Sequence, residues 1–169
     1  VNYYQSPHTS SLKNYVLLEV ALMLMDEPVF DILRTKEQLG YTVYCTLHKT
    51  CGILGASVTV NSQATKFTPD YVNDRIEAFL KWFIEEKLEN FQADEFNKIV
   101  TTLIKMKKAA DVKLSEEVSR NFAEIDYFEY LFDRREKEIR LLEKCKKDEV
   151  ISHITSIIGA AANRKKFSV

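Results

Sequence analysis

Glycine is scarce in this chain: its 169 residues include only four, and none of the four forms a Gly-rich turn between a strand and a helix. Phosphate-binding loops need such turns, because the backbone must come close to the phosphate groups. Nucleotide chemistry is therefore excluded for this segment.

Cysteine is also scarce, which restricts disulfide and metal chemistry. Cys45, Cys51 and Cys145 have neither the density of a secreted disulfide scaffold nor the close spacing of a metal knuckle. We interpret them as reduced thiols with structural roles. The alternative is a bond between Cys45 and Cys51, which flank a predicted hairpin turn where facing strand positions come close.

The sequence lacks a long apolar run and an excess of either charge. Its longest apolar stretch, residues 15–25, is interrupted by Glu19 and falls short of the roughly 20 residues that span a bilayer. The 24 basic and 25 acidic residues nearly cancel, so neither nucleic acid nor a membrane is expected as a partner. No signal or transit pattern opens the chain, although Val1 is not a natural initiator, and we expect a cytoplasmic location.

The three histidines do not form a metal-binding motif. A zinc peptidase needs two histidines one helical turn apart and a carboxylate that activates water, and His8, His48 and His153 have no such spacing. The cysteines have no evident base beside them. We therefore expect no catalytic residue, no metal ligand and no cofactor within this chain.

Alternating apolar residues predict strands in an α+β fold. The expected strands are residues 1–5, 41–48, 53–61 and 167–169, with the middle two joined as a hairpin. Residues 6–8 are expected to end the first strand, and Gly55 to mark a bulge or a close backbone approach. Because both chain ends fall in mid-sheet, an isolated copy has open sheet edges and a homodimer is possible.

Helical periodicity predicts several helices packed on that sheet. A core helix over residues 12–25, capped by hydroxyls at residues 9–11, is expected to stop at residues 26–28. Pro28 suits the first turn of a second helix, with Val29, Phe30, Ile32 and Leu33 facing inward and Gly40 at its end. Further helices are expected to begin near residues 68, 94, 115, 133 and 148, the last of them ending at Gly159. The chain is thus predicted to be one domain, residues 1–169, with a mixed or antiparallel sheet that is incomplete at its N-terminal side.

One junction between a helix and a strand could present side chains to a ligand. In the run LRTKEQLGY at residues 33–41, a basic helix end leads through glycine to a tyrosine at a strand start. Arg34 could donate two hydrogen bonds to a peptide carbonyl or carboxylate, and the Tyr41 hydroxyl could donate to a carbonyl oxygen as it becomes negative. The residue pattern alone favours a plainer interpretation, with Arg34 as a solvated cation and Tyr41 as a half-buried strand residue.

The same region carries a family resemblance that reverses this preference. The runs EPVFD at residues 27–31, LRTK at 33–36 and LGY at 39–41 resemble the C-terminal half of the pitrilysin family of inverzincin metallopeptidases, which includes insulin-degrading enzyme. The runs GILG at 52–55, SVTV at 57–60 and QATK at 63–66 resemble the branch of the family that cleaves at paired basic residues. The resemblance covers essentially the whole chain.

The resemblance implies a role inside a larger enzyme. Family members are clamshells of four related α+β domains; the first binds zinc, and the fourth, to which this chain would belong, faces it across a chamber. Arg34 and Tyr41 would then be substrate-binding residues that assist a zinc ion held in the N-terminal domain of the parent protein. The implied partners are the N-terminal half of the same polypeptide and peptide substrates cleaved near basic or dibasic sites.

The resemblance also leaves a second function open. Some family members have lost the zinc ligands of their first domain and persist as structural partners. This chain would then be a peptide- or protein-binding scaffold module of a catalytically inactive homologue. Residues that would separate the two functions lie outside this sequence.

Overall fold

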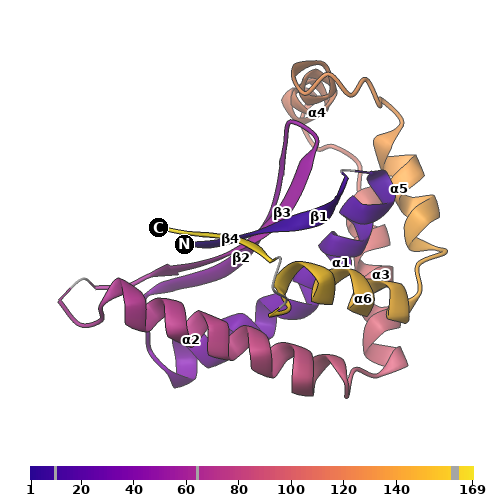
Figure 1. Cartoon of the computed structure of the whole chain (residues 1–169). Helices are drawn as coiled ribbons and strands as arrows, with labels where there is room; N and C mark the ends of the chain where they lie inside the picture. Colours follow the sequence, from indigo (N-terminus) through magenta and orange to yellow (C-terminus); the bar gives the residue numbers. More distant parts are fainter. Residues whose placement is uncertain (10, 64, 161–163) are drawn as a thin grey trace.

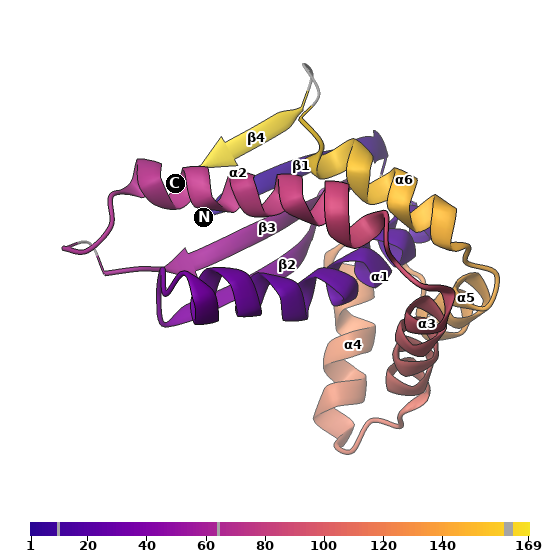
Figure 2. The ribbon, with the colours of Figure 1, turned by 90° about the horizontal axis from the view of Figure 1, so that it is seen from below.

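The computed structural model describes residues 1–9, 11–63, 65–160 and 164–169. In this part of the chain, four strands form one antiparallel sheet in the order β2-β3-β1-β4, and the helices lie on one side of it (Figures 1 and 2). The predicted α+β fold is confirmed, with an antiparallel sheet. The strands are β1 (Asn2–Thr9), β2 (Thr42–Thr50), β3 (Ile53–Asn61) and β4 (Lys165–Ser168).

The helices follow the order of the sequence. They are α1 (Leu12–Val29), η1 (Phe30–Lys36), α2 (Pro69–Trp82), η2 (Phe83–Leu88), α3 (Ala93–Lys108), α4 (Leu114–Asp126), α5 (Arg134–Leu142) and α6 (Lys147–Ile158), where η1 and η2 are π-helical segments. The core lies between α1 and the covered face of the sheet, where Tyr4, Ala56 and Val58 are buried. Residues on the other face, such as Tyr44 and Phe167, are exposed.

Strand β1 does not end at residues 6–8, as the sequence predicted. It continues to Thr9, and its register against β3 shifts between Gln5 and Thr9. Pro7 lies within this irregularity, so its missing N–H group removes no regular ladder hydrogen bond. The prediction was wrong because a bulge accommodates a proline that a regular ladder would exclude.

The break predicted at Pro28 is also absent. Helix α1 includes Pro28 and runs directly into η1, so one continuous rod connects residues 12–36. Burial of α1 on most of its sides compensates for the hydrogen bond that proline removes, and wider turns follow immediately. Val29 and Leu33 are buried as predicted, whereas Phe30 is exposed.

The predicted hairpin is confirmed, with a tight turn. Strands β2 and β3 pair from Thr42 opposite Asn61 to Thr50 opposite Ile53. Cys51 and Gly52 form the two-residue turn with positive φ angles of 48° and 76°, as hairpin turns of this length require. Gly55 marks a close approach, because an added Cβ would meet the Tyr3 ring.

Helix starts were predicted to within a few residues. Ser11 caps α1 by accepting from the Asn14 N–H at 3.1 Å, and Thr68 caps α2 in the same way; residue 10 lies outside the described residues. Ser115 and Asp148 are not N-caps, because α4 and α6 begin after Lys113 and Lys146. Asp133 directly precedes α5, as predicted, although its side chain makes no capping hydrogen bond. Gly159 ends α6, as predicted. Residues 161–163, in the loop that follows, lie outside the described residues.

Candidate functional site

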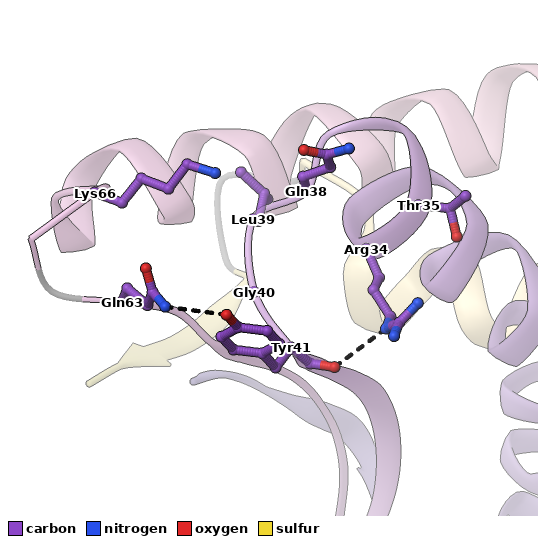
Figure 3. A pocket seen from close by; sticks show the side chains of 8 residues that line it. All are labelled: Arg34, Thr35, Gln38, Leu39, Gly40, Tyr41, Gln63 and Lys66. Atoms are coloured by element: carbon purple, nitrogen blue, oxygen red, sulfur yellow. Dashed lines mark hydrogen bonds between the residues drawn. The ribbon is translucent and has the colours of Figure 1, made fainter.

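Arg34 and Tyr41 line one cavity of about 390 Å³ at the end of η1 (Figure 3). The cavity lies where η1, the start of β2 and the segment after β3 meet. Its walls are formed by Arg34, Thr35, Gln38, Leu39, Gly40, Tyr41, Gln63 and Lys66. The structure therefore brings together the two residues that the sequence selected.

Arg34 is held by contacts that leave part of its guanidinium available. Its Nε donates to the main-chain carbonyl oxygen of Tyr41 at 3.1 Å, and its Cζ lies 4.7 Å from the centre of the Phe30 ring. The exposed Phe30 thus supports the cation by a cation–π contact. Within the described residues, the two terminal nitrogens of Arg34 have no protein partner, so they can donate to a ligand.

Tyr41 is open to solvent, unlike the half-buried strand residue that the pattern alone favoured. Its side chain is 74% exposed and lies one residue before β2. The hydroxyl accepts from Nε2 of Gln63 at 3.3 Å, and the main-chain N–H donates to the Asn61 carbonyl at 3.2 Å. These contacts orient the ring while the hydroxyl proton stays free to donate.

The connection between η1 and β2 fixes this geometry through local backbone features. Gln38 has a left-handed φ of 54°, which reverses the chain direction and turns Leu39 into the core. Gly40 packs against the Asn61 backbone so closely that a Cβ would collide with it. Arg75 of α2 binds both carboxylate oxygens of Glu37 at 2.6 and 2.7 Å and anchors the end of η1.

Two lining residues, Gln63 and Lys66, were not predicted as part of the site. They lie in the connection between β3 and α2, and hydrophobic periodicity carries no information about such a segment. The only signal in the sequence was that the run at residues 63–66 takes part in the family resemblance.

Comparison with known families identifies the chain. The family described as PQQ synthase PqqF-like, C-terminal lobe domain 4, matches residues 20–122, which include the whole Arg34–Tyr41 junction. The chain belongs to this family. It is thus a segment from the C-terminal part of a pitrilysin-family protein, and the resemblance found in the sequence is confirmed.

Relatives of this pitrilysin-family chain are much longer than the chain itself. It is 51% identical to nardilysin of Rattus norvegicus over 150 residues, which is 89% of this chain and 13% of the relative. It is 32% identical to human insulin-degrading enzyme over 163 residues, which is 96% of this chain and 16% of the relative. The chain therefore corresponds to a small fraction of each relative.

Solved structures of the pitrilysin type share the fold. Pitrilysin superposes with a TM-score of 0.74 at 20% identity, over 92% of this chain and 16% of pitrilysin. A structure from Bordetella parapertussis, described as the inactive peptidase domain of a putative zinc protease, gives a TM-score of 0.72 at 13% identity, over 99% of this chain and 89% of that chain. At these identities the likeness concerns the fold alone.

The part of the chain that the structure describes offers no fitting ligand set for the zinc ion that the family implies. Among the described residues, no group of three or more histidine, cysteine, aspartate or glutamate side chains could hold a metal ion. His48 lies 2.8 Å from the Ser57 hydroxyl, whereas His8 and His153 stack on each other.

No helix in the described ranges is long and apolar enough to cross a membrane.

The cysteines do not form an activated nucleophile. All three are free thiols, and Cys51 occupies the turn itself and does not face Cys45. Burial, with a smaller contribution from Asp26, raises the pKa of Cys45 to about 12, and burial raises the pKa of Cys145 to about 11. Both thiols are therefore protonated at neutral pH, which makes them poor nucleophiles.

Proposed function

We propose that this chain is most of the fourth, zinc-free domain of a zinc metalloendopeptidase and that Arg34 and Tyr41 bind its peptide substrate. The observation that carries the proposal is their convergence on one cavity, where both present unused hydrogen-bond donors. Family membership supports the peptidase context.

The contribution of these residues would be to position the peptide and to stabilise charge. The terminal nitrogens of Arg34 can donate to a peptide carbonyl, in a geometry already fixed by its Nε bond to Tyr41. The Tyr41 hydroxyl can donate to a carbonyl oxygen whose negative charge grows during attack. A zinc ion held by the N-terminal half of the parent polypeptide would supply the activated water.

Selection of basic or dibasic sites is proposed to reside mostly outside this chain. The residues that line the cavity, all of them described, include the cations Arg34 and Lys66 and no acid. A cationic cavity repels lysine and arginine side chains. Carboxylates that recognise them would therefore be contributed by another part of the parent, in the cytoplasmic setting that the sequence predicts.

The test compares cleavage of a dibasic peptide by the intact parent protein, with zinc present, and by variants of it. Arg34→Ala and Tyr41→Phe should each lower kcat/KM, with losses on the order of 100-fold for a donor that acts in the transition state. Arg140→Ala and Tyr44→Phe make the same chemical changes away from the cavity and should leave kcat/KM unchanged. Unchanged cleavage in folded Arg34→Ala and Tyr41→Phe variants would contradict the proposal.

A second candidate is a scaffold module of an inactive homologue that holds peptides without cleaving them. It is motivated by the family resemblance, because some family members have lost the zinc ligands of their first domain; the Bordetella parapertussis structure, described as an inactive peptidase domain, shares the fold alone. A folded parent that binds the dibasic peptide without cleaving it, and loses binding in Arg34→Ala, would select this function.

Self-association of the isolated chain also stays a prediction. Strands β2 and β4 are the outer strands of the sheet, so each has one edge that no other described strand pairs. Sedimentation of the isolated chain over a range of concentrations would detect a dimer formed through these edges.

A further inference from the structure

Helix α4 turns its apolar side away from the rest of the domain. Glu124 is the single buried side chain of this helix, all of whose residues the structure describes. Leu114, Val118, Phe122 and Ile125 are 77%, 55%, 56% and 43% exposed. Their spacing of four, four and three residues places them in one stripe, which we call the outer face of α4.

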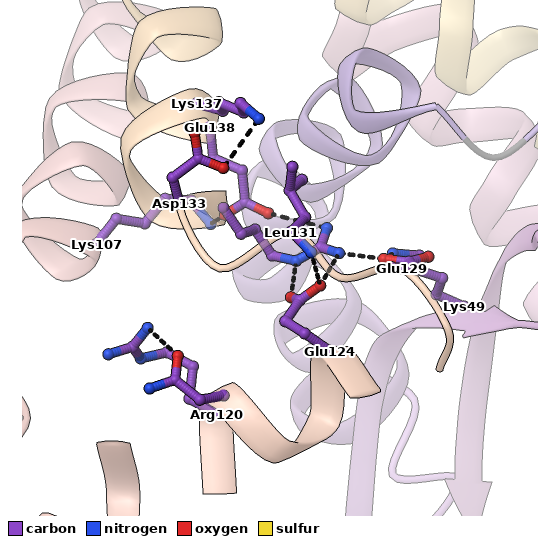
Figure 4. A network of polar contacts seen from close by, with 11 residues as sticks. Lys49, Lys107, Arg120, Glu124, Glu129, Leu131, Asp133, Lys137 and Glu138 are labelled. Atoms are coloured by element: carbon purple, nitrogen blue, oxygen red, sulfur yellow. Dashed lines mark hydrogen bonds and ion pairs between the residues drawn. The ribbon is translucent and has the colours of Figure 1, made fainter. Parts of the chain in front are cut away.

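The polar side of α4 attaches the helix to the domain (Figure 4). The Glu124 carboxylate accepts from the guanidinium of Arg134 and from the Leu131 N–H at 3.2 Å. Arg134 also binds Glu129, which in turn binds Lys49 of β2. These partly buried ion pairs fix which way the helix is rotated, so the outer face cannot turn inward without breaking them.

A second attachment lies one helical turn away on the same side. Nη2 of Arg120 donates to Asp111 at 2.9 Å, and Asp111 also accepts from Arg135 of α5 at 2.6 Å. Arg120 and Glu124 are four residues apart, on the side of the helix opposite the apolar stripe. Charge pairing on one side therefore accounts for the exposure of the other.

The outer face has the properties of a contact surface. Val118 and Phe122, together with Tyr127, line a cavity of about 440 Å³, and Phe128, two residues after the helix ends, is 79% exposed. A contiguous exposed patch of large apolar side chains marks an interaction site in a stable protein, because its burial releases water.

The occupant of this surface is inferred from chain length and charge. The chain spans 13% of its nardilysin relatives, and its family is the fourth domain of a C-terminal lobe, so most of the parent polypeptide lies outside residues 1–169. Glu117 and Asp126, on the two borders of the outer face, are exposed acids with no ion pair in the described part of the chain. A second copy docked symmetrically would bring acidic borders together.

We propose that the outer face of α4 docks onto another domain of the parent polypeptide, which presents an apolar patch bordered by basic residues. The contact is an interaction surface separate from the Arg34–Tyr41 cavity, and it does not depend on whether the parent cleaves peptides. Docking would cover the apolar stripe and pair the acids on its borders.

Hydrogen exchange tests the proposal without any substitution. Backbone amides of residues 114–126 should exchange at least about tenfold more slowly in the parent protein than in the isolated chain, because docking suppresses opening of the helix. Equal exchange rates in the two proteins would overturn the proposal. Protection that appears in the isolated chain as its concentration rises, and is absent from the parent, would assign the surface to a second copy and would also overturn it.

A pair of substitutions gives an independent test. In the parent, Val118→Asp with Phe122→Asp should return exchange of residues 114–126 to the rate of the isolated chain. In the isolated chain, the same pair should leave the circular dichroism spectrum and the unfolding midpoint nearly unchanged, because both side chains are more than half exposed. Met106→Asp, at an apolar α3 residue that is 63% exposed, is the matched control. Retained protection in the doubly substituted parent, or an equal loss in the control, would overturn the proposal.

Discussion

The imidazole rings of His8 and His153 stack with 5.5 Å between their centres and 23° between their planes, although one belongs to β1 and the other to α6. His153 is only 5% exposed, and its Nε2 has no hydrogen-bond partner in the described structure. Burial, with a smaller contribution from the neighbouring His8, lowers the pKa of His153 from 6.5 to about 4. The folded protein therefore holds this ring neutral.

Stability should consequently fall as the pH drops from 6.5 towards 4. In that window the unfolded chain binds a proton at residue 153 that the folded chain does not, so the free energy of unfolding increases with pH. The full effect is about 3 kcal/mol, from about 1.4 kcal/mol per pKa unit. Urea unfolding of the isolated chain from pH 4 to pH 7 measures it. His153→Gln should flatten the profile in this window, and an unchanged slope in that variant would assign the dependence to other groups.

Lys107 lies between two acidic side chains in a largely buried cluster of charges. Replacing Lys107 should therefore lower the free energy of unfolding. Its Nζ pairs with Glu19 and with Glu138, both at 2.8 Å, and burial raises the pKa of Glu19 despite the lysine. Lys107→Met would leave Glu19 without its cation and Glu138 with only the longer contact to Arg134 at 3.8 Å, and should cost about 3–5 kcal/mol of unfolding free energy.

Two further variants test the assignment. Adding Glu138→Gln to Lys107→Met should recover part of the loss, because it removes a buried charge that has lost its shorter ion pair. Lys81→Met removes the partner of Glu85 in an exposed pair and should cost less than about 1 kcal/mol. Equal losses in Lys107→Met and Lys81→Met would mean that burial does not decide the cost.

Gly55→Ala should destabilise the sheet by about 1–3 kcal/mol, because the added methyl group overlaps the Tyr3 ring and forces it to move. The cost should largely disappear in a Tyr3→Ala background, where the methyl group has room. A Cβ added at Gly52 would meet no neighbouring atom. Gly52→Ala should therefore lower the free energy of unfolding only through the strain of its positive φ. Denaturant unfolding of the unaltered chain, the Gly55→Ala and Tyr3→Ala variants and the double variant completes the cycle. A Gly55→Ala cost that persists in the Tyr3→Ala background would exclude this contact as its cause.

Cys51 should react with iodoacetamide before the other two cysteines do. It is exposed in the hairpin turn, whereas burial keeps Cys45 and Cys145 protonated at pH 8. Peptide mapping after short exposures measures the three rates, and unfolding in urea should make them similar. Faster labelling of Cys45 in the folded chain would show that the β2 edge opens.

Local patterns predicted the parts of the fold that local forces determine. Thr68 and Pro69 indicated the start of α2. The alternation of apolar and polar residues on either side of the turn at Cys51 and Gly52 indicated the hairpin. The strand end predicted at Pro7 and the helix break predicted at Pro28 were wrong. At these positions a bulge and the burial of α1 compensate for the missing N–H group through tertiary structure. That compensation depends on contacts that no short window of sequence contains.

The candidate site was predictable only through the resemblance. Arg34 and Tyr41 looked ordinary by spacing, and Gln63 gave no local signal at all. Helical periodicity shows that one face of α4 is apolar without showing what covers it. The role of Arg134 in holding α4 emerges only from its ion pairs with Glu124 and Glu129.

The widened turns of η1 determine the direction in which Arg34 points. In a regular α-helix each residue advances the side-chain direction by about 100°, whereas i→i+5 turns advance it less and shift the angular phase of everything that follows. An alignment that assumes a regular helix from Leu12 onwards would place Arg34 on the wrong side. If the same residues formed a regular α-helix instead of η1, the guanidinium of Arg34 would be rotated away from the cavity.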